Sequence, residues 1–121
     1  MLLILVVDDE SMIGGLIQQA AQQNGWRTNV ASSGEDALAY LDCVRPDLVI
    51  SDHDMPGISG LELRRRMLMN PACNGIRFIL MTGGVITERQ AKEAGCDGFL
   101  PKPFTLAAFR EMISRVCPEK N

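Results

Sequence analysis

Leu3-Ile4-Leu5-Val6-Val7-Asp8-Asp9-Glu10, near the start of the chain, joins five apolar residues to three acidic ones. A short apolar run without polar interruption is typical of a strand that is buried on both faces of a parallel sheet. The acidic residues end the run far short of a signal sequence or a membrane span. The stretch therefore predicts a buried strand that leads directly into carboxylates, in a cytoplasmic protein that makes no contact with a membrane.

Two later runs have the same character, and two more are weaker. Leu48–Ser51 and Ile76–Met81 are short and largely apolar, as expected of further central strands. Arg27–Ala31 and Gly98–Leu100 are more polar or shorter, which places them nearer the edges of the sheet. Five strands are predicted in all.

Helical patterns lie between these strands. Ile13, Leu16, Ile17 and Ala20 follow Ser11, a candidate N-cap, at the spacing of one apolar helix face. The candidate N-caps of the later helices are Ser33 (with Asp36 as a possible capping box), Ser59, Thr87 and Thr105. The apolar stripes of the third and fifth helices are Leu61, Leu63, Met67 and Leu68, and Leu106, Phe109, Met112, Ile113 and Val116. The fourth helix is expected to be short, ending by Ala94.

The alternation of strands and helices predicts an α/β fold. We expect a doubly wound, five-stranded parallel sheet in the flavodoxin-like order 2-1-3-4-5, with helices on both faces. A chain of 121 residues suits one domain, so residues 1–121 are expected to form a single domain without an output domain. In such sheets the ligand site lies beyond the carboxyl ends of the strands.

Composition narrows the classes of protein to consider. Apolar residues make up 46% and charged residues 22% of the chain, which is ordinary for a folded domain. The net charge is −3 and the basic residues are dispersed, apart from Arg64, Arg65 and Arg66 in one predicted helix, which argues against direct binding of nucleic acid. The four cysteines form no C-x-x-C pair and the chain has one histidine, so reduced and mostly buried thiols are expected rather than a zinc site.

Polar residues follow four of the predicted strands at one edge of the sheet: Asp8 and Asp9, Asp52, Thr82, and Lys102. Three carboxylates gathered there would repel one another unless a cation joined them, and hard oxygen ligands suit Mg²⁺. Lys102 adds a positive charge and Thr82 a hydroxyl donor, which together describe a pocket for a phosphoryl group. A carboxylate in that pocket can act as a nucleophile and form an aspartyl phosphate.

Each of these residues also has a plainer interpretation when taken alone. Asp8 and Asp9 could cap the first helix, because carboxylates suit a helix N-terminus. Thr82 could be an ordinary strand-end residue, and Lys102 a solvated charge. The combination, rather than any one member, favours the phosphoryl site.

His53 could be a phosphohistidine donor or a general base, and the methionines could form a binding surface, but we favour neither interpretation. Side chains alternate along a strand, so His53 is expected to point away from its neighbour Asp52. Met67, Met69, Met81 and Met112 are expected to fill the core.

Four runs, taken together, resemble the signatures of response regulator receiver domains. The runs are Val7-Asp8-Asp9-Glu10, Asp52-His53-Asp54-Met55-Pro56-Gly57-Ile58-Ser59-Gly60, Met81-Thr82-Gly83 and Gly95-Cys96-Asp97-Gly98-Phe99-Leu100-Pro101-Lys102-Pro103-Phe104. They occur in the family's order, at near-family spacing and each at a predicted strand end. The resemblance spans the whole chain.

The resemblance implies a role for each matching acidic residue. Asp52 would be the phosphoacceptor and also a metal ligand. Asp9 would bind the metal directly, Asp8 through water, and Asp54 through its backbone carbonyl. The metal would be Mg²⁺, with Mn²⁺ as a substitute.

It also implies roles for the residues around the phosphoryl group. Lys102 would bind a phosphoryl oxygen, and the Gly83 backbone would contact the group. Thr82 would close onto it after transfer, and Phe99 would change rotamer with Thr82. The peptide bond from Lys102 to Pro103 would be cis, a form that costs much less free energy before proline than before other residues.

The function implied by the resemblance is that of a phosphoacceptor in a two-component phosphorelay. The donor would be a histidine kinase or a histidine phosphotransfer protein. The signal would pass to a downstream protein partner or a fused domain. No enzyme activity is implied beyond self-catalysed phosphotransfer and autodephosphorylation.

Three alternatives stay open at this point. Asp52-x-Asp54 is similar to the nucleophile pair of haloacid-dehalogenase-type phosphatases, although their acidic metal pair follows the nucleophile. A pseudo-receiver would bind partners without phosphorylation. A flavodoxin would bind flavin, although a hydroxyl-rich loop after the first strand is missing.

Some positions depart from the common family pattern. Many receivers have alanine after the switch threonine, whereas this chain has Gly83-Gly84, so the loop is expected to be mobile without phosphate. Phe99 lacks the hydroxyl of the commoner tyrosine. Asp54 and Gly84 flank the approach of water to the phosphoryl group in the family, and an open path beside a carboxylate predicts fast self-dephosphorylation.

Overall fold

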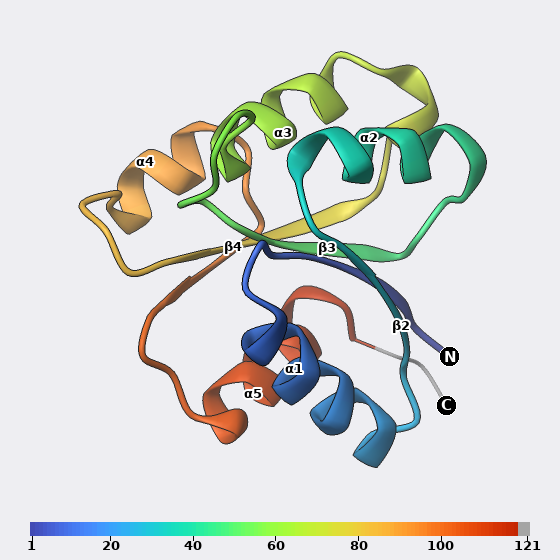
Figure 1. Ribbon diagram of the computed structural model, residues 1–121, viewed down its shortest axis with the longest axis vertical. Coiled ribbons are helices and arrows are strands. Elements are labelled where there is room, and N and C mark those ends of the chain that lie inside the picture. Colours follow the sequence, from blue (N-terminus) through green and yellow to red (C-terminus); the bar gives the residue numbers. More distant parts are fainter. Residues whose placement is uncertain (119–121) are drawn as a thin grey trace.

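The sheet holds five parallel strands in the order β2-β1-β3-β4-β5, as the alternating sequence pattern predicts. A computed structural model describes residues 1–118, apart from the side chains of residues 11–14. The strands are β1 (Leu3–Val7), β2 (Arg27–Ala31), β3 (Leu48–Asp52), β4 (Arg77–Thr82) and β5 (Gly98–Pro101). Helices α1 (Ser11–Gln23) and α5 (Leu106–Val116) cover one face, and α2 (Gly34–Cys43), α3 (Gly60–Leu68) and α4 (Glu88–Glu93) cover the other (Figure 1). A 3₁₀ turn, Pro71–Cys73, follows α3.

Alternating side chains of the strands build a separate core on each face of the sheet. Ile4 and Val6 of β1 pack with residues of α1 and α5, such as Ile17 and Phe109. Leu5 and Val7 point to the opposite face and pack in the core beneath α2, α3 and α4. These four of the five β1 residues are fully buried. This double burial is why the central strands are continuous apolar runs.

The strand register aligns the carboxyl ends of the strands at one edge. Val7 is paired with Ser51, and Asp52 with Met81. Thr82 is in turn paired with Pro101. The residues that end or follow β1, β3, β4 and β5 therefore face a common space.

Side-chain caps start four of the helices where the sequence predicts them. The hydroxyls of Ser33, Ser59, Thr87 and Thr105 each accept a backbone N–H from the third residue of the helix that follows. The full capping box occurs at Thr87 with Gln90. After Ser33 the box is only half formed, because the Asp36 carboxylate accepts instead from Ser32. The fourth helix, α4, is short, as expected.

The first helix begins one residue earlier than predicted. Ser11 is its first residue and Glu10 takes the N-cap position, without a side-chain capping bond. The turn before it is closed by Asp8, whose Oδ1 accepts the Glu10 N–H at 2.8 Å. The side chains of Ser11 and Ile13 lie outside the described part of the structure.

Several apolar residues that were assigned to the core are exposed. Leu16, Leu68 and Met69 have exposed fractions of 52%, 58% and 71%. Leu68 and Met69 line an open cavity between α3 and the end of α4. The other three methionines, Met67, Met81 and Met112, are buried as predicted.

The expectation for the cysteines holds in part. All four thiols are free, but only Cys73 is buried, whereas Cys43 is exposed and Cys96 and Cys117 are partly buried. Within the described residues, no helix is both long enough and apolar enough to cross a bilayer.

Candidate functional site

Three carboxylates meet at the carboxyl edge of the sheet, as the strand pattern predicts. Asp8 and Asp9 follow β1 and Asp52 ends β3, and one oxygen from each lies within 4.8 Å of the other two. Asp8 and Asp52 are only 2% and 1% exposed, whereas Asp9 is exposed. The group therefore has a buried floor and one side open to solvent.

The buried floor contains an unsatisfied acceptor. Asp8 Oδ1 accepts the Glu10 N–H, but Asp8 Oδ2 is buried and has no hydrogen-bond partner among the described residues. Desolvation by burial raises the pKa of Asp8 above 3.8, and the charge of Asp52 raises it further, against the lowering effects of the Glu10 hydrogen bond and Lys102. An orphaned carboxylate oxygen beside two more carboxylates fits a hard divalent cation. The alternative role of Asp8 and Asp9 as caps is not what the structure shows, because Glu10 is the N-cap.

Lys102 supplies the positive charge beside the buried acceptor. Its Nζ donates to Asp52 Oδ2 at 3.1 Å. The Lys102 backbone N–H donates to the Thr82 carbonyl at 2.8 Å, and the bond to Pro103 is cis, as the resemblance implies. The other Asp52 oxygen, Oδ1, accepts the Asp54 N–H at 3.2 Å. Both carboxylate oxygens of Asp52 are thus held in place.

Thr82 and Gly83 are bound to a side chain that the sequence did not assign to them. Thr82 Oγ1 donates to Asp54 Oδ2 at 3.1 Å, and the Gly83 N–H donates to the same oxygen at 3.3 Å. The Gly84 N–H donates to Thr82 Oγ1 at 3.0 Å. The loop after β4, which its two glycines predict to be mobile, is therefore linked to the loop after β3.

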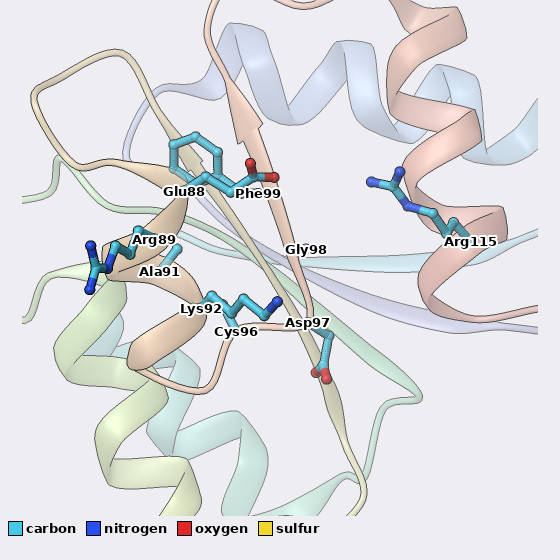
Figure 2. Close-up of a pocket in the computed structure, with 9 residues that line it drawn as sticks. All are labelled: Glu88, Arg89, Ala91, Lys92, Cys96, Asp97, Gly98, Phe99 and Arg115. Atoms are coloured by element: carbon cyan, nitrogen blue, oxygen red, sulfur yellow. The ribbon is translucent and has the colours of Figure 1, made fainter.

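Phe99 lies apart from the three carboxylates. It sits on β5, is partly buried against the core beneath α2, α3 and α4, and lines a cavity of about 510 Å³. Figure 2 shows this cavity, with Arg89 and Lys92 from α4 on one side of β5 and Arg115 from α5 on the other. Phe99 is thus in a place where a change of rotamer would alter the surface of this cavity.

His53 points away from the acceptor, as predicted from strand alternation. Its Nδ1 accepts the Leu61 N–H at 3.4 Å, on the side of α3. It lines the cavity between α3 and α4 rather than the acidic group.

The arrangement has the parts that phosphoryl chemistry on a carboxylate requires. The buried carboxylate of Asp52 belongs to the three-carboxylate group, which could hold a cation, and also pairs with the Lys102 ammonium. Opposite charges on both sides can offset the negative charge of phosphoryl oxygens. The sequence brought Asp8, Asp9, Asp52 and Lys102 together correctly. It placed the Asp54 side chain beside the path of water, but it did not reveal that this carboxylate accepts from Thr82 and Gly83.

Comparisons with known proteins give one consistent family. The family model for the response regulator receiver domain matches residues 4–114. A curated relative, sporulation initiation phosphotransferase F of Bacillus subtilis (strain 168), is 33% identical over 120 residues, covering 98% of this chain and 95% of the relative. Other relatives are longer: the chain spans 43% of a transcriptional regulatory protein of Mycobacterium tuberculosis that is 31% identical over 113 residues.

Solved structures agree in fold. The chemotaxis response regulator CheY4 of Vibrio cholerae superposes with a TM-score of 0.89 at 28% identity, over 96% of this chain and 98% of that one. The receiver domain of the sensor histidine kinase PA1611 of Pseudomonas aeruginosa, solved with magnesium coordinated in its active-site cleft, has a TM-score of 0.84 over 94% of this chain and 95% of that one. At 22% identity, the second likeness concerns the fold alone.

Proposed function

Because this chain belongs to the response regulator receiver domain family, we propose that Asp52 is the residue that accepts the phosphoryl group. Receiver domains are phosphoacceptor modules of two-component signalling rather than enzymes that turn over a small substrate. One observation carries the assignment: Asp52 is a buried carboxylate that belongs to the three-carboxylate group and also pairs with Lys102. Family membership disfavours the phosphatase and flavodoxin alternatives.

The acidic group is typical of the magnesium site of receivers, and its residues fit the ion. We assign Asp9 and Asp52 as direct ligands, Asp8 as a ligand through water, and the Asp54 carbonyl as a further oxygen. Mg²⁺ bound there would offset the charge that gathers on the phosphoryl oxygens during transfer. Mn²⁺ accepts the same oxygen ligands and would substitute.

The chain's own residues perform the transfer. An Asp52 carboxylate oxygen attacks phosphorus, a new oxygen–phosphorus bond forms, and the bond to the donor's imidazole nitrogen breaks. The imidazole leaves with the electron pair and takes up a proton. Lys102 then moves from Asp52 to a phosphoryl oxygen, Gly83 and Thr82 donate to the other oxygens, and Phe99 follows Thr82.

Receivers take phosphoryl groups from histidine kinases or phosphotransfer proteins, and we assign a donor of this kind to this chain. The output is a phosphorylation-dependent contact with a downstream protein or a fused domain. We treat residues 1–121 as one receiver domain. The cavity beside Phe99 is a surface that phosphorylation could alter.

The test is intact-mass measurement after incubation with acetyl phosphate and Mg²⁺. We expect one added phosphoryl group on the wild type and none on Asp52→Asn, because the amide is not a nucleophile. Chelation of the metal should suppress the added mass almost as fully. Asp42→Asn, which removes an exposed carboxylate near the end of α2, is the matched control and should be phosphorylated normally. Full phosphorylation of Asp52→Asn would refute the assignment.

A further inference from the structure

The Asp54 side chain occupies the two hydrogen-bond donors that the proposed phosphoryl site needs. Its Oδ2 accepts from the Thr82 hydroxyl at 3.1 Å and from the Gly83 N–H at 3.3 Å. Asp54 also reaches the acceptor, because its own N–H donates to Asp52 Oδ1 at 3.2 Å. The residue therefore links the phosphoacceptor to the loop after β4 before any phosphoryl group is present.

The two uses of the Thr82 hydroxyl exclude each other. A hydroxyl carries one proton, so it donates one hydrogen bond at a time. The Gly84 N–H donates to Thr82 Oγ1 at 3.0 Å, which fills an acceptor position and leaves the proton directed to Asp54. Thr82 can bind a phosphoryl oxygen only after it has released Asp54.

Gly84 leaves the space in which Asp54 lies. A Cβ atom at residue 84 would sit 3.1 Å from Asp54 Oδ1 and 3.5 Å from Thr82 Oγ1. The first distance is shorter than an ordinary contact between carbon and oxygen, so a side chain at residue 84 would push the carboxylate away. The hydrogen bonds and the missing side chain are two separate observations that place Asp54 against Thr82.

We propose that Asp54 is a positioning residue that holds Thr82 and Gly83 in the unphosphorylated arrangement and competes with the phosphoryl group for their donors. The inference rests on the proposed function, since it takes Thr82 and Gly83 as the groups that bind phosphoryl oxygens. Loss of the Asp54 bonds is then a step in switching. Asp54 sets how readily the loop changes from one arrangement to the other.

The first test measures the affinity of the full chain for beryllofluoride, a phosphoryl mimic, in the presence of Mg²⁺. Asp54→Ala should bind it roughly fivefold more tightly, as expected when a competing hydrogen bond of about 1 kcal/mol is removed. Asp54→Asn loses the charge but keeps an oxygen acceptor for Thr82, so its gain should be smaller. In a Thr82→Ala background, the gain from Asp54→Ala should shrink, because the main competition is gone.

Equal gains from both substitutions that persist in the Thr82→Ala background would mean simple charge repulsion and would overturn the proposal. The second test needs no phosphoryl chemistry: amide hydrogen exchange at Gly83 and Gly84 in metal-free protein should be several-fold faster in Asp54→Ala than in the wild type. Unchanged exchange would also overturn the proposal. A wild type that takes no phosphoryl group from acetyl phosphate would instead refute the proposed function, while the exchange result would still decide whether Asp54 holds the loop.

Discussion

Asp54 and Gly84 lie side by side next to the proposed phosphoacceptor. The Asp54 N–H donates to Asp52, and a Cβ at residue 84 would lie 3.1 Å from the Asp54 carboxylate. Hydrolysis of an aspartyl phosphate needs a water in line with the bond from phosphorus to Asp52. A glycine has no side chain to exclude that water, and a carboxylate can accept a hydrogen bond from it and orient it.

We therefore predict a short-lived phosphoryl group. Gly84→Leu should slow its loss on the order of tenfold by blocking water, and Asp54→Ala should also slow it by removing the acceptor. The measurement is the decay of phosphorylated protein after donor removal, followed by intact mass. His53→Ala should decay like the wild type, because His53 points toward α3. Decay that is unchanged or faster in both test variants would show that neither position controls access of water.

The gathering of Asp8, Asp9, Asp52 and Lys102 was predictable, because the end of a parallel strand fixes where the next residue lies. The partner of Thr82 was not. Asp54 reaches Thr82 from an irregular loop, and the direction of a loop side chain depends on backbone angles that hydrophobic periodicity does not encode. Two adjacent glycines led to the prediction that the loop after β4 is mobile. The sequence of that loop does not reveal its contact with Asp54, for the same reason.

The strands were predicted to within one residue at each end, whereas α3 shows where a hydrophobic pattern misleads. Its buried residues are Gly60, Leu63, Arg64 and Met67, at helical spacing. A pattern built from apolar residues passes over glycine and arginine, so it selected Leu68, which is exposed. The pattern predicted the buried face of α3 correctly, but it did not identify all of the residues on that face correctly.

Arg64 is buried because it joins three elements. Its Nε donates to the Gly95 carbonyl at 2.8 Å and its Nη1 to the Ile76 carbonyl at 3.2 Å. It also pairs with Asp97 at 3.4 Å and lies 5.4 Å from the centre of the Phe78 ring. The side chain thus connects α3 to the start of β4 and to the turn before β5.

We predict that Arg64→Ala lowers the free energy of unfolding by about 3 kcal/mol, since it leaves the buried Ile76 carbonyl and the partly buried Gly95 carbonyl without this donor and removes the ion pair with Asp97. Urea denaturation followed by circular dichroism would measure the change. Arg65→Ala is the matched control on the same helix: its pair with Glu62 is exposed to solvent, so its loss should change the stability far less. Equal losses for the two variants would contradict a special role for Arg64.

At the level of the whole domain, the fold places a destabilising group where the function needs it. The parallel register brings the carboxylates together at one edge of the sheet. Burial leaves Asp8 Oδ2 without a partner among the described residues and raises the pKa of Asp8. The rest of the two cores must offset this, so we expect the stability of the domain to depend on metal and on pH.

The sign of that dependence follows from the pKa of Asp8. Because the folded-state pKa lies above the unfolded value of 3.8, the neutral carboxyl is the form that folding favours. The contribution of Asp8 to stability is therefore fully present below the unfolded pKa and is lost as pH rises through the folded pKa. In metal-free protein, ionised Asp8 should lower stability at neutral pH, whereas a cation bound to the carboxylates should reverse this.

We predict that Asp8→Asn melts a few degrees higher than the wild type in chelator at neutral pH. Asparagine keeps an oxygen for the Glu10 N–H but carries no charge, so it removes the repulsion without removing the hydrogen bond. As pH falls through the folded pKa of Asp8 toward 3.8, the wild type should gain stability relative to the variant. Saturating Mg²⁺ should raise the melting temperature of the wild type more than that of the variant.

The measurement is thermal unfolding of both proteins across this pH range, with Mg²⁺ and with chelator. A lower melting temperature for Asp8→Asn in chelator at neutral pH would show that the Asp8 charge stabilises the metal-free fold, contrary to the repulsion argued here.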